Sequence, residues 1–199
     1  MRWWIFVPAA ALVLMLDAAL MPAFAVGGHV PHLWPLLLAF VSLYASRTAA
    51  LWGAVVVGFW LDAMHPALGI GGDAPRAVPV FGPHVLACVA GAWAVLESRT
   101  WLYRRNTLTV AFSTFVCAVF ASLAFIAIAG IRAAYADPTP LWGGGSGAAA
   151  MGSDIVDAFL SALVAVLPAW ALQRTLTAWA FATAGPRFSG TARVLRAGD

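Results

Sequence analysis

Four aspartates lie inside or beside long apolar stretches of this sequence, where a charged side chain is costly. They are Asp17, Asp62, Asp154 and Asp157. At the centre of a membrane helix an Asp costs roughly 2.5–3.5 kcal/mol, so such residues often belong to proton relays or coupling-ion sites. A carboxylate can also serve structure, by accepting hydrogen bonds between helices. Each position therefore has a functional and a structural interpretation.

The structural interpretation is favoured at three of these positions. No Lys or Arg lies at a mid-span position to pair with Asp17, so a relay through it lacks a second member. Asp154 and Asp157 follow Ser153, which is a plausible N-cap residue. Negative charge at a helix N-terminus is favoured by roughly 0.3–1 kcal/mol. We therefore expect Asp154 and Asp157 to lie at the start of a helix and to stabilise it.

Asp62 ends the apolar stretch "WGAVVVGFWLDAMHP", residues 52–66. Gly58 and Ala54 lie four and eight residues before it, on the same helix face, and form a small-xxx-small pair that lets another helix approach closely. Ala87 and Gly91 repeat the pattern later in the chain. We predict that Asp62 is a structural anchor, which accepts hydrogen bonds from loop amides or a neighbouring helix and has no catalytic role.

Neither a metal site nor a catalytic motif is predicted. Asp62 and His65 have only scattered further candidate ligands, such as Asp73 and His84, and His84 is interpreted as a hydrogen-bonded packing residue. The chain has no HExxH, GxSxG, P-loop or Ser-Lys pattern, so we predict no enzyme and no cofactor. An intramembrane enzyme is retained as a hypothesis only for the case that the four aspartates converge around one cavity.

The composition indicates an integral membrane protein. Of 199 residues, 63% are hydrophobic and 10% charged, with a mean hydropathy of +0.89, whereas a soluble domain carries about 25% charged residues. Such a chain cannot cover itself with polar surface. The basic residues are all Arg, and their excess indicates membrane orientation, not nucleic-acid binding. Cys88 and Cys117 lie within apolar runs and are expected to be buried and reduced.

The elements that must position the aspartates are six predicted transmembrane helices. They form an all-α bundle over residues 1–184, followed by a basic cytoplasmic tail, 185–199. A span needs about 20 apolar residues, and the second and third segments are shorter. We expect the first helix to be an uncleaved span, with a signal peptide cleaved after the A-x-A pattern of Ala23 and Ala25 as the alternative. We expect the stretches 64–79 and 132–153 to be extracytoplasmic loops. The helices are expected at about 3–26, 33–46, 48–63, 80–96, 108–131 and 155–181.

The arginines predict the orientation of this bundle. With the N-terminus in the cytoplasm, two arginines, Arg76 and Arg132, face outward. The positive-inside rule therefore favours an even number of spans with both termini cytoplasmic. The arginines that face the cytoplasm in this arrangement are Arg2, Arg47, Arg99, Arg104, Arg105, Arg174, Arg187, Arg193 and Arg196.

Residues 1 to 105 resemble the rod shape-determining protein MreD family. The family pattern is a Pro-led Leu-rich helix, a basic corner, a Gly-spaced helix ending in Leu-Asp, a Pro-Leu-Gly-like turn, and a Gly/His-led helix ending in a basic residue. Residues 70–80 depart from it as an insertion. The matching residues are Pro31, Arg47, Gly53, Gly58, Leu61, Asp62, Pro66, Leu68, Gly69, Gly82, His84 and Arg99.

The resemblance implies a non-enzymatic scaffold of the bacterial cell-elongation machinery in the inner membrane. It implies binding to an MreC-like protein and indirect association with MreB-like filaments and the RodA–penicillin-binding-protein synthase, which together guide lateral peptidoglycan synthesis. The family fold is similar to that of the six-helix substrate-binding subunits of energy-coupling-factor vitamin transporters, and such a subunit is the alternative function. Candidate partner or structural residues are Asp17, Ala54, Gly58, Asp62, His84, Ala87 and Gly91.

Overall fold

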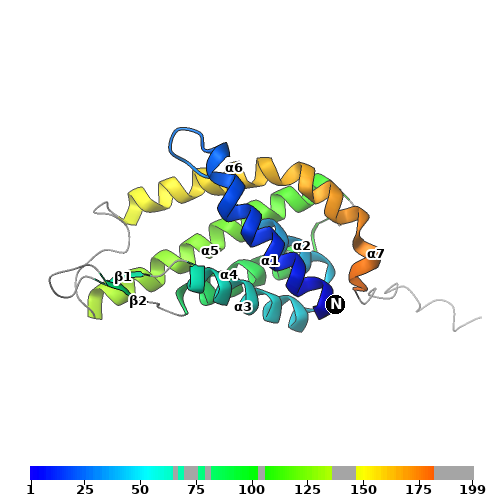
Figure 1. Ribbon diagram of the computed structural model, residues 1–199, viewed down its shortest axis with the longest axis horizontal. Coiled ribbons are helices and arrows are strands. Elements are labelled where there is room, and N and C mark those ends of the chain that lie inside the picture. The colour runs from blue at the N-terminus through cyan, green and yellow to red at the C-terminus, as the bar shows by residue number, and fades with distance from the viewer. Residues whose placement is uncertain (65–66, 70–75, 79–81, 103–105, 136–146, 182–199) are drawn as a thin grey trace, which may run out of the picture.

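The computed structural model describes residues 1–64, 67–69, 76–78, 82–102, 106–135 and 147–181. It is a helical bundle with one small hairpin between the third and fourth helices (Figure 1). The helices are α1 (Trp3–Leu20), η1 (Met21–Phe24, a 3-10 turn), α2 (Trp34–Tyr44), α3 (Arg47–Met64), α4 (Pro83–Ser98), α5 (Thr107–Tyr135), α6 (Gly147–Arg174) and α7 (Leu176–Trp179).

Within the described part of the chain, three helical segments are long and apolar enough to cross a membrane by themselves. They are Trp3–Phe24, Thr107–Ile131 and Ala150–Arg174. The described chain is therefore predominantly α-helical and has the character of a membrane protein, as its composition predicts. The predicted helix at 48–63 corresponds closely to α3, and the helix at 80–96 corresponds closely to α4.

The short helix α2 forms the centre of the bundle. Each of its residues from Pro35 to Leu43 is buried, and α2 contacts α1, α3, α4, α5 and α6. Eleven residues of α-helix extend about 16 Å, roughly half the hydrocarbon thickness of a bilayer. A helix that is apolar all round is stable when other helices surround it. The segment predicted as a second span is therefore buried at the centre of the bundle, and its helix is shorter than a span.

Glycines allow the tightest helix contacts. A Cβ atom added to Gly58 would lie 2.4 Å from the Cα of Val85 in α4. A Cβ atom added to Gly91 would lie 2.5 Å from the carbonyl oxygen of Cys117 in α5. Because Ala54 and Ala87 are also buried, both predicted small-residue pairs pack against helices of this same chain. They provide the close α3–α4 and α4–α5 packing and are not exposed to an external partner.

One end of the bundle carries four arginines, and we call it the arginine end. Arg47 at the start of α3 pairs with Glu97 at the end of α4 at 3.0 Å. Arg99 donates hydrogen bonds to the carbonyl oxygens of Ser42 and Ala45, which end α2. Figure 1 shows the N-terminus and α7 at this same end, and the amide of Arg2 donates to the carbonyl of Trp179. Arg174 ends α6 beside them.

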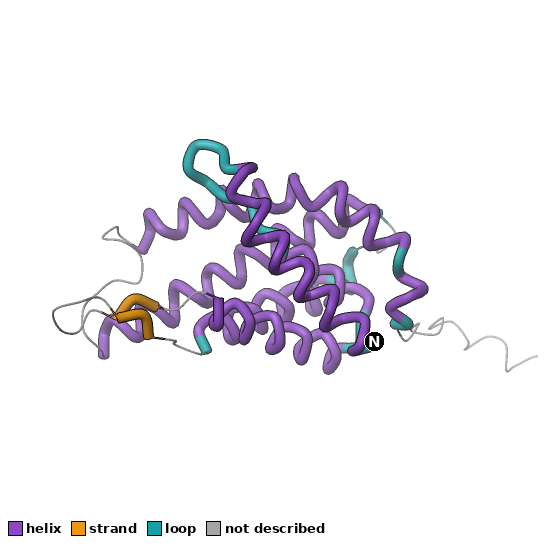
Figure 2. Tube along the Cα trace, viewed as in Figure 1, coloured by secondary structure: helices purple, strands orange, loops and turns teal. Residues whose placement is uncertain are grey.

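The opposite end of the bundle is called the aspartate end. Here α3 ends near Asp62, α4 begins, and the hairpin of β1 (Ala67–Gly69) and β2 (Arg76–Val78) lies between them (Figure 2). The two strands pair antiparallel, which the prediction of an irregular loop at 64–79 missed. The rest of that loop, including most of the predicted insertion at 70–80, lies outside the described residues.

The last predicted helix, 155–181, has different boundaries in the structure. It begins at Gly147, eight residues earlier than expected, and it is interrupted at Thr175, so that α7 forms a separate turn. Thr175 donates its hydroxyl to the carbonyl of Leu172, a local hydrogen bond that competes with the helix. Trp179 then packs its ring on Phe40 of α2. The predicted tail, 185–199, lies outside the described residues.

Candidate functional site

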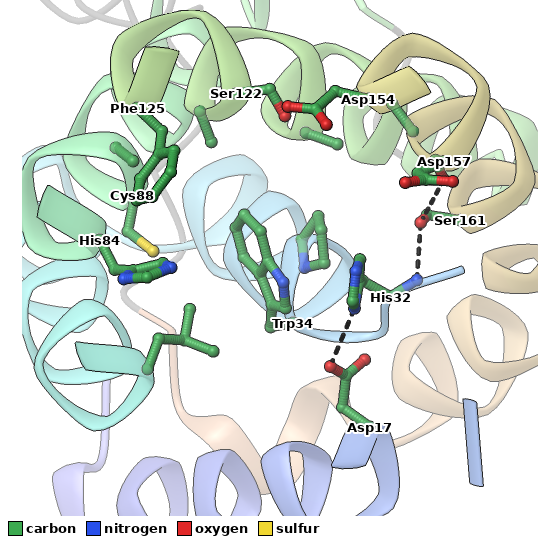
Figure 3. Close-up of a pocket in the computed structure, with 16 residues that line it drawn as sticks. Asp17, His32, Trp34, His84, Cys88, Ser122, Phe125, Asp154, Asp157 and Ser161 are labelled. Carbon is green, nitrogen blue, oxygen red and sulfur yellow. Dashed lines mark hydrogen bonds and ion pairs between the residues drawn. The ribbon is translucent and has the colours of Figure 1, made fainter. Parts of the chain in front are cut away.

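The described helices line a partly open cavity of about 280 Å³ toward the aspartate end. Its walls are mainly apolar, and polar side chains project into it from several helices (Figure 3). Such a site lies at the lower end of the roughly 300–1,000 Å³ found for small-molecule pockets. The lining residues are Asp17, His32, Trp34, Pro35, Leu61, His84, Ala87, Cys88, Ala118, Ala121, Ser122, Phe125, Asp154, Asp157, Ala158 and Ser161.

Asp17 holds the loop between α1 and α2 at one side of the cavity. Its carboxylate accepts a hydrogen bond from the amide of Leu33 and another from Nδ1 of His32, at 3.2 Å. Leu33 precedes α2, whose first amides have no partner within the helix. Asp17 is 8% exposed, and the histidine supplies the partner that no Lys or Arg provides. The structural interpretation of Asp17 is therefore supported, and the same residue also lines the cavity.

The same loop is held to α6 by a second set of contacts. Nδ1 of His29 donates to the carboxylate of Asp157 at 3.0 Å. The amide of His32 donates to Oγ of Ser161 at 2.7 Å, and Ser161 donates in turn to the carbonyl oxygen of Asp157. These contacts join residues more than 120 positions apart in the sequence. They close the bundle between its first and last long helices.

A tight glycine turn places the two histidines. Val26 and His29 exchange two backbone hydrogen bonds across Gly27 and Gly28, whose φ angles are +62° and +87°. A two-residue turn with both φ angles positive strongly favours glycine. The turn directs His29 toward α6, and Pro31 then leads to His32 and the start of α2. Local sequence thus determines how the loop presents its two imidazoles.

Asp62 joins α3 to α4 at the edge of the cavity. One carboxylate oxygen accepts the amide of Gly82 at 2.7 Å, and the other accepts the amide and Nδ1 of His84 at 3.0 and 2.7 Å. These amides lie at the N-terminus of α4, where helix donors are unsatisfied and negative charge is favoured. Asp62 is 1% exposed. These contacts are the ones expected of an anchor, and the structural role itself stays a prediction; Pro66, its predicted helix stop, lies outside the described residues.

Asp154 and Asp157 do not lie at a helix N-terminus, so this prediction is wrong. Because α6 begins at Gly147, Ser153 lies within the helix and the two carboxylates lie about two to three turns from its start. Asp157 binds His29, whereas Asp154 lies beside Ser122 of α5 (Figure 3). The sequence signal failed because Gly147 to Ala150 resemble a flexible loop in composition, although they form helix.

The charge around His32 is predominantly negative. Burial alone would lower the pKa of His32, but its hydrogen bond to Asp17 and the carboxylates of Asp17, Asp157 and Asp154 outweigh this effect. The pKa of His32 therefore lies above its ordinary value of 6.5. His32 is in the loop outside the helices, and its protonated form strengthens the contact with Asp17.

The aspartates converge on one cavity, which is the condition for retaining the hypothesis of an intramembrane enzyme, whereas the contacts of Ser161 are those of a structural hydroxyl. Ser161 directs its proton to the carbonyl of Asp157 and accepts from a backbone amide, so it has no general base. His32 and Asp17 are paired, but the imidazole does not contact the Ser161 hydroxyl in this network. The described His, Cys, Asp and Glu side chains include no group of three placed to hold a metal ion.

The structure thus brings together residues that the sequence leaves apart. Three of the four aspartates line one cavity, and Asp62 contacts it through His84. His29 and His32 were not predicted as site residues; the signal that could have found them is the pair of imidazoles three residues apart between two apolar segments. Comparison of the chain with protein-family models, with curated proteins and with solved structures finds no match.

Proposed function

We propose that this protein is a non-enzymatic membrane scaffold of the bacterial cell-elongation machinery, similar to MreD. The observation that carries the proposal is the junction of α3 and α4. Gly58, Asp62, Gly82 and His84, which carry part of the resemblance, meet there in one set of contacts. These residue types occur together because each contributes to the packing or hydrogen bonding of the α3–α4 junction. A family motif that specifies a fold is expected to have such a structural basis.

The proposed topology has six helices with both termini in the cytoplasm of a bacterial inner membrane. Its support is the separation of charge: Arg2, Arg47, Arg99 and Arg174 lie at the arginine end, and positive charge is enriched on the cytoplasmic side. Arg132 lies near the end of α5, and in the proposed orientation this end of the helix faces outward. In this orientation the cavity lies in the outer half of the membrane.

The partner in this proposal is the single membrane helix of an MreC-like protein, with MreB-like filaments and the RodA–penicillin-binding-protein synthase associated through it. The pairs Ala54/Gly58 and Ala87/Gly91 are buried within the bundle, so they cannot contact that helix. The partner must use a lipid-facing surface. The small-residue pairs thus serve the scaffold indirectly, by fixing the relative positions of the helices that present this surface.

Co-purification tests the scaffold. The tagged chain is expressed with an MreC-like protein and extracted in mild detergent, and an unrelated single-span protein at equal abundance serves as the control. We expect enrichment of the MreC-like protein alone. Recovery of neither protein, with both confirmed in the same membranes, would remove the support for a scaffold of this kind.

The cavity favours a second candidate function, the substrate-binding membrane subunit of a vitamin-type transporter. A pocket lined by helices α1 to α6, with polar groups converging on it, is the common form of a small-molecule site. Native mass spectrometry of the purified chain tests this function. A retained small molecule, together with capture of an ATPase-coupled membrane partner in place of an MreC-like one, would establish the transporter subunit over the scaffold.

A further inference from the structure

We infer that the cavity binds a small organic cation, with Asp154 as its counter-charge and Trp34 and Phe125 as aromatic walls. The inference rests on the second candidate function, a membrane subunit that binds a small molecule, and it does not depend on the proposed role as a scaffold. It specifies the chemical class of ligand, which neither the composition nor the resemblance indicates.

The first step is the pairing of the carboxylates. Asp17, Asp62 and Asp157 each accept a hydrogen bond from a histidine. Asp154, by contrast, is half-buried and forms no ion pair with the described residues, and its neighbour in the cavity is the neutral hydroxyl of Ser122 (Figure 3). A half-buried carboxylate without a close cationic partner is less stable than a paired one. A ligand with positive charge would satisfy this group.

The second step is the lack of arginine among the described residues of the cavity wall, where the histidines are already paired with carboxylates. The lining residues include His32 and His84 but no Arg. Arg132 is the next arginine along α5, ten residues beyond Ser122, which places it about 15 Å further along the helix axis. The arginine end lies at the other extreme of the bundle. The wall therefore favours a cation and disfavours an anion, which would meet the carboxylates of Asp17, Asp154 and Asp157.

The third step is the shape and chemistry of the remaining wall. Trp34 projects into the cavity between His84 and His32 (Figure 3), and Phe125 packs against His84 with ring centroids 4.8 Å apart. Aromatic faces attract cations, and the combination of aromatic rings with a carboxylate is suited to organic ammonium groups. A hydrated inorganic ion gains little from the mainly apolar walls. A volume of about 280 Å³ limits the ligand to a small molecule.

The test uses the purified full-length chain in lipid nanodiscs, with choline, tetramethylammonium and methylguanidinium as cationic probes. The neutral molecule 3,3-dimethylbutanol has the shape of choline without its charge and is the matched control ligand. Binding is measured as the shift in thermal unfolding, followed by tryptophan fluorescence, and as the ligand-dependent change in that fluorescence. A ligand that binds only the folded chain raises its unfolding midpoint.

We expect at least one cationic probe to bind about tenfold or more tightly than the neutral control. Asp154→Asn should remove this preference while leaving binding of 3,3-dimethylbutanol unchanged. Glu97→Gln, which alters a half-exposed carboxylate at the arginine end, should leave both unchanged. If the Asp154 variant does not fold, the comparison of cationic and neutral probes on the wild-type chain decides the question.

Three outcomes overturn the inference. Equal binding of cation and neutral isostere, or an Asp154→Asn variant that folds and keeps the preference, shows that charge does not select the ligand. Binding of none of the three cations shows that the cavity holds water or an uncharged molecule. In each case a retained neutral molecule in the mass spectrum would still support the second candidate function, so failure of the ligand class is distinguishable from failure of that function.

Discussion

At the residue scale, Asp62 is the position where the sequence and the structure agree most closely. Its carboxylate satisfies two backbone amides and one imidazole at the junction of α3 and α4. The sequence could predict this because Asp62 follows a small-residue helix face and precedes a loop. A carboxylate in that position has few possible partners other than the amides of the loop or of a neighbouring helix. The donors themselves, Gly82 and His84, lie about 20 residues away, and spacing alone does not identify them.

The loss of stability caused by a substitution of Asp62 should increase with the number of hydrogen bonds that the substitution removes. Asp62→Asn keeps one carbonyl oxygen as an acceptor, whereas Asp62→Leu leaves the amides of Gly82 and His84 unsatisfied. A hydrogen bond to a charged group contributes about 1.5–3 kcal/mol. We expect a modest fall in the unfolding midpoint in detergent for Asn and a larger fall, with reduced folded yield, for Leu. Equal and negligible effects of both changes would contradict the anchor.

The Asp62→Asn variant also distinguishes a structural role of the carboxylate from a role of its charge in function. If Asp62→Asn abolished function in cells while the folded yield and partner recovery stayed normal, the charge itself would be functional. The anchor account predicts the opposite: function should follow the folded yield across both variants.

The His32–Asp17 contact should make stability depend on pH. Burial lowers and the surrounding carboxylates raise the pKa of His32, with a net upward shift. The contact therefore contributes fully below the unfolded value of about 6.5 and is lost as pH rises through the higher folded pKa. We expect the unfolding midpoint of the wild-type chain to fall more over this range than that of His32→Gln. An identical pH profile for the two proteins would refute the assignment.

Residue-scale reasoning failed where the partners come from distant segments. Asp154 and Asp157 were assigned to helix capping because Ser153 precedes them, and the histidines of loop 25–33 were not considered as their neighbours. His29 meets Asp157 only because a glycine turn and the packing of α6 bring residues 128 positions apart together. Such contacts depend on tertiary structure, which a local pattern does not contain.

At the element scale, the two glycine contacts determine how closely the helices pack. Gly58→Ala would place a methyl group against the backbone of Val85, and Gly91→Ala would place one against the carbonyl of Cys117. Backbone cannot yield as a flexible side chain can, and overpacking costs typically about 1–3 kcal/mol. We expect both variants to lower the unfolding midpoint clearly.

Gly152→Ala in α6 is the matched control for these variants. Its added Cβ has no atom within 4 Å, and alanine is favoured over glycine within a helix by about 0.5–1 kcal/mol. The control should therefore be neutral or slightly stabilising. A loss of stability equal to that of Gly58→Ala would show that helix packing is not the cause.

The sequence predicts some helix boundaries closely and misses other helix boundaries and the two strands. The boundaries of α3 and α4 follow from Arg47, Pro83 and the apolar periodicity, which are local signals. The start of α6 at Gly147 was missed because its Gly- and Ala-rich first turns have a loop-like composition, and β1 and β2 were missed because three-residue strands carry almost no pattern. The burial of α2 was also unexpected, since a short apolar run can be a span or a core helix.

At the scale of the whole molecule, the charge distribution predicts the orientation. Arg2 and Trp179 are joined by a backbone hydrogen bond, so the N-terminus and the end of α7 lie on one side. A green fluorescent protein fused after the last residue should fluoresce, because it folds in the cytoplasm. An alkaline phosphatase fusion at the same point should be inactive. Active phosphatase with no fluorescence would invert the proposed topology.

The most direct test of the scaffold is the site of new wall synthesis in the bacterial host after depletion of this protein. New peptidoglycan is labelled with a fluorescent D-amino acid, and the ratio of lateral to septal incorporation is measured. We predict that lateral incorporation falls, that the cells become rounder, and that the wild-type chain restores both. Unchanged lateral incorporation and cell shape, with depletion verified, would contradict a role in cell elongation.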